Sequence, residues 1–279
     1  MSVAFRTLRL HAVRCIPLCT ALAVIFAPLE VRAQHDDDHD DDHHHAPVHF
    51  SHPLFTESPS PDTKLRLDFI RGVLSHDVSD NTFRVEGEYA FTRNVSIEAN
   101  VPLTSRAING DRTTAVGSGE IALKLASFAA AEHGVLLGGG VGFGVPTGND
   151  EKGIGSGHLV EIEPYVDAGY MRGALELVSF ASYSTTARRD AGEEKEEEVA
   201  LAASALYHLS PRFESLIEME TRRALSGEES GNQIVNAGVG LKYHVARVRA
   251  LVVGVGGRIP LTSHREFQSE LIVSALYHF

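Results

Sequence analysis

Histidine and aspartate residues crowd into one short stretch near the N-terminus. Residues 35–45 read HDDDHDDDHHH. Neutral imidazoles suit Zn²⁺, Ni²⁺ or Cu²⁺, and aspartate adds carboxylate oxygens. The candidate metal ligands are His35, His39, His43, His44 and His45. The alternative is that this stretch is a solvated polar linker. Composition alone cannot distinguish the two, because it does not specify a ligand geometry.

A second set of ionisable residues consists mostly of carboxylates that alternate with apolar residues. Its acidic members are Glu86, Glu88, Glu98, Glu161, Glu163, Asp167, Glu176, Glu218 and Glu220, and its cations are Arg66, Arg84, Lys124 and Lys242. Rings of carboxylates attract cations in channels. Polar interiors are general in membrane barrels, so the same residues also fit a lumen filled by paired charges. Both interpretations stay open at this stage.

The sequence offers no recognisable catalytic centre. A hydrolase on a barrel wall would need a serine–histidine constellation, and the G-x-S-x-G nucleophile motif is absent. The pair Ser75-His76 is too common to carry weight. We therefore predict a protein that is not an enzyme and requires no cofactor.

The first 33 residues have the form of a secretory signal peptide. Arg6, Arg9 and Arg14 precede an apolar run at 16–27, and Ala33 ends a small-x-small cleavage site. The apolar run is shorter than the roughly 20 residues that span a bilayer. Both cysteines of the chain, Cys15 and Cys19, would be removed with this segment. The net charge of −12 also argues against a nucleic-acid partner.

Residues 34–62 are predicted to form a disordered His/Asp-rich periplasmic segment. The stretch is dense in charge, His, Pro and Ser. Such a composition buries too little apolar area to offset the loss of chain entropy on folding.

From Thr63 to the C-terminus, apolar and polar residues alternate with a period of two. The first clear example is 82–91, where Phe83, Val85, Tyr89 and Phe91 alternate with polar residues. This period is the signature of β-strands. It predicts about twelve strands, at 63–72, 82–91, 95–103, 119–128, 134–145, 158–170, 174–184, 197–209, 213–221, 232–243, 248–261 and 267–279.

The connections between these strands alternate in length. Short turns are predicted at 92–94, 129–133, 171–173, 210–212 and 244–247, and longer loops at 104–118, 146–157, 185–196, 222–231 and 262–266. An even number of strands with short turns at one end and longer loops at the other is typical of an outer-membrane barrel. The sequence therefore predicts an all-β fold, a transmembrane antiparallel β-barrel over residues 63–279.

A repeated pentapeptide marks one end of this barrel. SALYH occurs at 204–208 and again at 274–278, and LKYH occurs at 241–244. The tyrosines of these motifs, Tyr207, Tyr243 and Tyr277, share the parity of the apolar face and fall at the periplasmic ends of their strands. Outward aromatic rings at that level form the interfacial girdle of membrane barrels.

The signal peptide, the period-two strands and the terminal LIVSALYHF together resemble Gram-negative outer-membrane β-barrel proteins. More narrowly, VPLTSR at 101–106, GVPTGN at 144–149 and the strand spacing are similar to transporters of the phenol meta-pathway degradation family. The resemblance implies an outer-membrane location, and a C-terminal aromatic residue, Phe279, that the barrel-insertion machinery reads. It implies no catalytic residues, and the His/Asp head is not part of it.

The sequence thus predicts an outer-membrane channel or transporter for small solutes, with a preference for cations. Two alternatives remain open. One is a protein that handles transition-metal ions through its His/Asp head, and the other is a structural barrel with a closed lumen. The predicted partners are outer-membrane lipid, the insertion machinery, and small solutes or metal ions.

Overall fold

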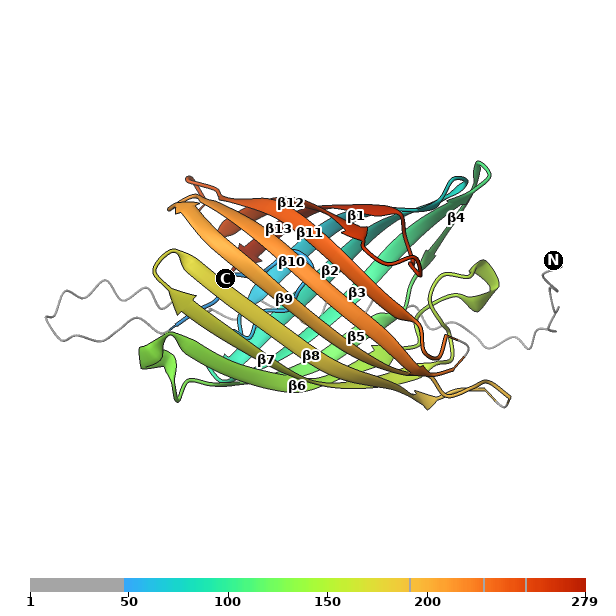
Figure 1. Ribbon diagram of the computed structural model, residues 1–279, viewed down its shortest axis with the longest axis horizontal. Helices are drawn as coiled ribbons and strands as arrows, with labels where there is room; N and C mark the ends of the chain where they lie inside the picture. The colour runs from blue at the N-terminus through green and yellow to red at the C-terminus, as the bar shows by residue number, and fades with distance from the viewer. Residues whose placement is uncertain (1–47, 191, 228, 249) are drawn as a thin grey trace, which may run out of the picture. The chain divides into compact units, whose positions relative to one another are not determined.

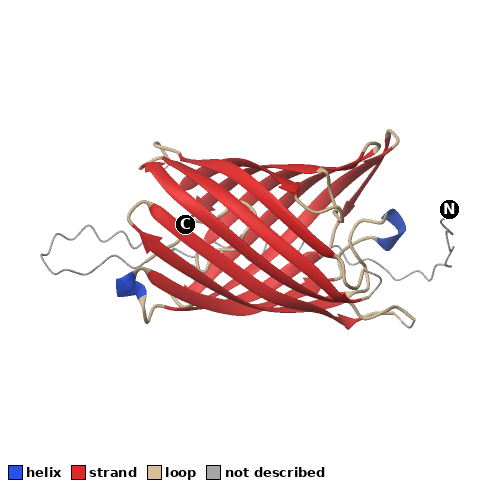
Figure 2. Ribbon diagram, viewed as in Figure 1, coloured by secondary structure: helices blue, strands red, loops and turns tan. Residues whose placement is uncertain are grey.

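The computed structural model describes residues 48–190, 192–227, 229–248 and 250–279. The predicted signal peptide and the five head histidines lie outside these residues. The described part is almost entirely β-structure, with two single-turn 3₁₀ helices, η3 (Ala131–His133) and η4 (Asp150–Lys152) (Figure 2). None of its helices is long and apolar enough to cross a membrane.

Thirteen strands occur in the described residues (Figure 1). They are β1 (Lys64–Ser75), β2 (Val78–Thr92), β3 (Val95–Ile108), β4 (Asp111–Val116), β5 (Gly119–Ser127), β6 (Val135–Val145), β7 (Val160–Arg172), β8 (Leu175–Arg188), β9 (Glu197–Ser210), β10 (Phe213–Ser226), β11 (Gln233–His244), β12 (Leu251–Pro260) and β13 (Ser269–His278).

Twelve of these strands form a closed antiparallel barrel. Each barrel strand pairs with its neighbours in the chain, and β1 pairs with β13 from Lys64↔His278 to Val73↔Ser269 to close the ring. Strand β4 stands outside the ring, because it pairs with β3 alone, while β3 continues the ring through β5. Closure leaves no unpaired edge among the barrel strands, as a hydrocarbon environment requires.

The two faces of each strand differ as the period-two pattern predicts. On β10, Ile217 is 65% exposed and the next residue, Glu218, is 3% exposed; on β7, Val166 and Asp167 differ in the same way. The outer wall therefore presents a belt of exposed apolar side chains and the inner wall carries charged ones. An apolar outer band around a charged interior is typical of a transmembrane β-barrel, whose outer wall faces lipid.

The predicted strand positions agree with the observed ones, and the main difference lies in the predicted loop 104–118. Residues 104–108 continue β3, the chain reverses at Asn109-Gly110, and β4 returns beside it. Asn109 and Gly110 both have positive φ, of 53° and 93°. This is the backbone of a two-residue hairpin turn, for which Asn-Gly is the preferred sequence. The segment was predicted as a long loop because most residues of β4 are polar.

We call the end of the barrel that carries the turns at 93–94, 173–174 and 211–212 the turn end, and the opposite end the loop end. The aromatic residues Tyr89, Tyr207 and Tyr277 lie at the turn end with 39–51% of their surface exposed. The ring of Tyr277 packs edge-on against Phe279, and that of Phe213 contacts Tyr243. The outward girdle predicted from the repeated motif is therefore present at this end.

Residues 34–62 were predicted to be disordered, and this prediction is wrong for residues 48–62. These fifteen residues carry no regular secondary structure, but they fold inside the barrel at its turn end, where Phe50 is 0% and Leu54 is 2% exposed (Figure 1). Composition predicted disorder because the segment cannot form a core by itself. The barrel supplies that core through inward apolar side chains, which are Ala126, Leu136, Val178, Leu206, Leu216 and Ile272. We call residues 48–62 the plug.

Candidate functional site

One carboxylate on the barrel wall holds the centre of the plug. The side chain of Glu218, on β10, accepts hydrogen bonds from the backbone N–H groups of Leu54 (2.9 Å), Phe55 (3.1 Å) and Thr56 (2.8 Å). The hydroxyl of Ser204, on β9, also donates to it at 2.9 Å. A carboxylate that accepts several N–H bonds satisfies backbone donors that the plug, lacking helix or strand, leaves without partners.

Two further wall carboxylates bind the start of the plug. The backbone N–H of Ser51 donates to Glu176 on β8 at 2.8 Å, and its hydroxyl lies 3.3 Å from both Glu176 and Glu214. Beside it, the ring of Phe50 fills the space over Gly169, where an added Cβ would lie 2.6 Å from the ring. The wall residue there must be glycine for the plug to pack.

A glycine-lined hollow receives Leu54. Cβ atoms built on Gly240, Gly254 and Gly256, on β11 and β12, would lie 2.6–2.8 Å from the methyl groups of Leu54. Real Cβ atoms do not approach other atoms this closely, so the hollow exists only because these residues lack side chains. Next to it, the guanidinium of Arg258 lies 4.8 Å from the ring centroid of Phe55, a cation–π contact.

Paired charges hold the opposite side of the plug. The ammonium of Lys124, on β5, lies 2.6 Å from Glu57 of the plug, and that of Lys64 lies 3.0 Å from Glu86 and 3.1 Å from Glu88. Burial by itself would raise the pKa of Glu57, but Lys124 and Lys64 together hold it below its usual value. Buried charges in a barrel interior need such partners, because an unpaired one is costly to desolvate.

Above the plug, the lumen contains a cavity of about 460 Å³. Its floor is the plug itself, from Leu54 to Glu57. Its wall carboxylates are Glu86, Glu98, Glu120, Glu161, Glu163, Glu198 and Glu220, and its cations are Arg66, Arg84, Lys124 and Arg222. Among these lining residues acid outnumbers base, so the cavity carries a net negative charge.

The residues predicted to face the lumen all lie on inward faces, but they divide between two places. Glu86, Glu98, Glu161, Glu163 and Glu220 line the cavity. The other four, Glu88, Asp167, Glu176 and Glu218, are buried lower in the barrel with 2–5% exposure, and three of them bind plug residues. The predicted metal ligands His35, His39, His43, His44 and His45 lie outside the described residues.

Sequence reasoning missed the histidines of the repeated motif. It assigned the tyrosines to the girdle and left the next residue unexplained. In the structure His208 contacts Glu176 at 2.5 Å, His244 contacts Glu214 at 2.5 Å, and His278 contacts Asp62 at 2.5 Å. The signal was present in the motif, since the residue after an outward tyrosine on a strand must point inward.

No family model and no curated protein matches the sequence. Solved structures do resemble the fold. An outer membrane channel from Pseudomonas putida F1 is 13% identical, covers 83% of this chain and 100% of its own, and superposes with a TM-score of 0.63. The KdgM porin in complex with disordered oligogalacturonate is 12% identical over 77% of this chain and 99% of its own, with a TM-score of 0.52. The NanC porin is 10% identical over 78% and 98%, with a TM-score of 0.51.

These likenesses, together with the outward apolar belt, define the class of protein. The chain is a closed twelve-stranded β-barrel with the fold of bacterial outer-membrane channels and porins. The narrower resemblance to the phenol meta-pathway degradation family remains a prediction from the sequence.

Proposed function

We propose that this protein is an outer-membrane channel for small polar solutes, that it favours cations, and that the plug closes its turn end in the state described here. The observation that carries the proposal is the charged cavity directly above the plug. A structural barrel would gain more from an apolar or fully paired filling than from an open space lined by excess carboxylates. The likeness of the fold to known channels and porins also supports a channel.

The charge of the cavity supports the cation preference. Carboxylates that line a narrow passage raise the local concentration of cations and repel anions. Glu161 and Glu163 lie on one strand, β7, at the level of the cavity. Neither belongs to the contacts that hold the plug, so they can be changed without loosening it.

Ion selectivity in planar bilayers tests the cation preference. In a KCl gradient, wild-type protein should show a reversal potential on the cation side. The double variant Glu161→Gln, Glu163→Gln should shift this potential towards zero. Glu132→Gln, at an exposed position in the turn between β5 and β6, is the matched control and should leave the potential unchanged. Anion selectivity in wild type, or an equal shift in the control, would remove the preference.

The metal-handling alternative rests on the His/Asp head. If His35, His39, His43, His44 and His45 bind Zn²⁺, Ni²⁺ or Cu²⁺, the imidazoles must be deprotonated, so affinity should fall as the pH drops through about 6.5. Replacing the five with Ser should abolish the metal binding that the head contributes and leave the barrel folded. If calorimetry gives the same number of bound ions and the same affinities for the two proteins, the head is only a solvated linker.

The C-terminal residue is proposed as the signal that the barrel-insertion machinery reads. Phe279 is 57% exposed beside Tyr277, at the end of the strand that closes the ring. Phe279→Ser should lower the fraction of assembled barrel in cells, measured by the faster migration of unheated protein in SDS gels. The purified variant should still fold in detergent, because the strand ladder is intact.

A further inference from the structure

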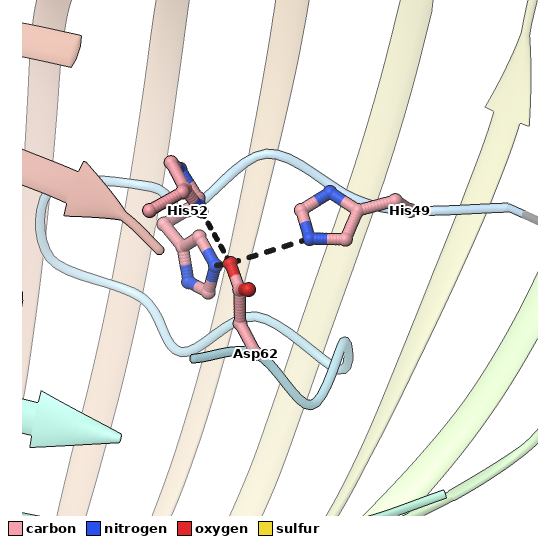
Figure 3. Close-up of side chains that lie close together, drawn as sticks. His49, His52 and Asp62 are labelled. Carbon is pink, nitrogen blue, oxygen red and sulfur yellow. Dashed lines mark hydrogen bonds and ion pairs between the residues drawn. The ribbon is translucent and has the colours of Figure 1, made fainter. Parts of the chain in front are cut away.

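Three imidazoles converge on a single carboxylate oxygen at the turn end of the barrel. Figure 3 labels two of these histidines, His49 and His52, beside Asp62. Oδ2 of Asp62 lies 3.4 Å from Nε2 of His49, 3.3 Å from Nε2 of His52 and 2.5 Å from Nδ1 of His278. The ring centroids of the three histidines are 5.7–6.0 Å apart, so the rings surround this oxygen nearly evenly. Three such contacts exceed the two lone pairs of one carboxylate oxygen.

The four residues come from the plug and from the opposite end of the chain. His49, His52 and Asp62 belong to the plug, with Asp62 two residues before β1, and His278 ends β13. The carboxylate of Asp62 is fixed from behind, because its Oδ1 accepts a hydrogen bond of 2.7 Å from the backbone N–H of Thr63. Its Oδ2 faces the three imidazoles.

His52 differs from the other two histidines in its second contact. Its Nδ1 lies 3.2 Å from the ammonium of Lys64, which can only donate. Nδ1 therefore accepts, and Nε2 carries the proton that is donated to Asp62. A nitrogen that holds a proton cannot also bind a metal ion, so His52 positions the carboxylate instead of acting as a ligand.

We infer that His49, Asp62 and His278 form a binding site for a divalent transition-metal ion of the Zn²⁺ type. Two imidazole nitrogens and one carboxylate oxygen are a donor set that Zn²⁺ takes, with water in the fourth position. Bonds of about 2.0–2.1 Å in a tetrahedron place ligand atoms roughly 3.3 Å apart. The distance of 3.4 Å between Nε2 of His49 and Oδ2 of Asp62 fits that value. The distance of 2.5 Å between Nδ1 of His278 and Oδ2 of Asp62 is too short, so the His278 ring must rotate away when the ion binds.

Such an ion would join the plug to both strands that close the barrel. His49 lies in the plug, and Asp62 lies where the plug leads into β1. His278 ends β13, the strand that pairs with β1 to close the ring. Binding would therefore stabilise the plugged state of the barrel. The inference stands on this geometry alone and does not depend on the channel proposal or on the His/Asp head.

The repeated pentapeptide supplies a matched control for the test. His278 and His208 occupy the same position of SALYH at the same end of the barrel, but His208 contacts Glu176 in place of Asp62. The test uses the mature chain with the five head histidines replaced by Ser, titrated with Zn²⁺ alone in a calorimeter. Each variant is first checked for folding by heat-modifiable migration in SDS gels.

The background protein should bind one Zn²⁺ per chain. His278→Ala and His49→Ala should each weaken this binding at least tenfold, and His208→Ala should leave it unchanged. Because the side chain of His49 is 49% exposed, His49→Ala should fold even if His278→Ala does not. In that case the Zn²⁺ affinity of His49→Ala alone tests the site. Absence of Zn²⁺ binding in the background protein, or equal affinity in His49→Ala, would overturn the site.

Discussion

At the scale of single residues, one step along a strand separates lipid from lumen. Val166 is 63% exposed on the outer wall of β7, and Asp167, the next residue, is buried inside. Val166 pairs with Ala181 near the middle of β8, so it lies near the mid-plane of the wall. Its replacement by a cation places a charge in hydrocarbon.

Val166→Arg should lower the free energy of unfolding by about 2–4 kcal/mol, the cost of a cation at the bilayer midplane. Urea unfolding in lipid vesicles measures it. Glu163→Arg, on the inward face of the same strand, is the control, and it should change ion selectivity more than stability. If Val166 accepts the charge freely and Glu163 does not, the assigned faces of the strand are reversed.

Glu218 provides the second prediction at this scale. Its carboxylate accepts the N–H groups of three consecutive plug residues, and hydrogen bonds to a charged acceptor contribute about 1.5–3 kcal/mol each. Glu218→Gln puts an N–H₂ group among those donors and should release the plug, which single-channel recording would detect as higher conductance. Glu220→Gln, two residues along the same face, should leave the plug closed. Equal conductance in the two variants would show that Glu218 does not hold the plug.

At the scale of elements, the plug depends on glycines in the wall. Gly256→Ala would put a Cβ 2.6 Å from Leu54, whereas a Cβ at the neighbouring Gly257 meets its nearest atom at 3.4 Å. We expect Gly256→Ala to displace Leu54 and raise the rate of protease cleavage within the plug, with the barrel still folded. Gly257→Ala should be cleaved at the wild-type rate, and equal rates for both variants would argue against the hollow.

The plug should also loosen in acid. The pKa of Glu57 lies below its usual value because Lys124 and Lys64 outweigh the effect of burial. A depressed pKa means that the ion pair stabilises docking fully above the unfolded value of about 4.3 and loses this contribution as the pH falls through the folded value. Conductance should therefore rise below about pH 4, and Glu57→Gln should show a smaller rise. An identical pH profile for the two proteins would exclude Glu57 as the sensor.

The barrel could be predicted from the sequence, and the plug could not. Strands carry their own signal, because each alternates locally between lipid-facing and lumen-facing residues. The plug has no local pattern: Phe50 and Leu54 stand among Pro, Ser and His, and the backbone N–H of Leu54 donates to a carboxylate 164 residues away. The alternation of residues along each strand predicted which carboxylates point inward. It could not predict which of them contact the plug and which line the cavity, because that depends on where the plug lies. The cluster around Asp62 joins residues 49 and 278, a contact that only closure of the ring creates.

At the scale of the whole molecule, the fold separates two roles. The twelve-stranded ring closes through β1 and β13 and needs no help from the plug to complete its ladder. The plug occupies the turn end and leaves a charged cavity above it. The barrel should therefore stay folded when the plug is removed, and only its permeability should change.

The most direct test of the account compares single-channel conductance of the mature protein with that of a variant lacking residues 48–60, in the same bilayer. Both should migrate as folded barrels when unheated. Low conductance is expected for the mature protein, and a several-fold higher, cation-selective conductance for the deletion. Equal conductance in two folded proteins would contradict it, since the plug would then not be what closes the lumen.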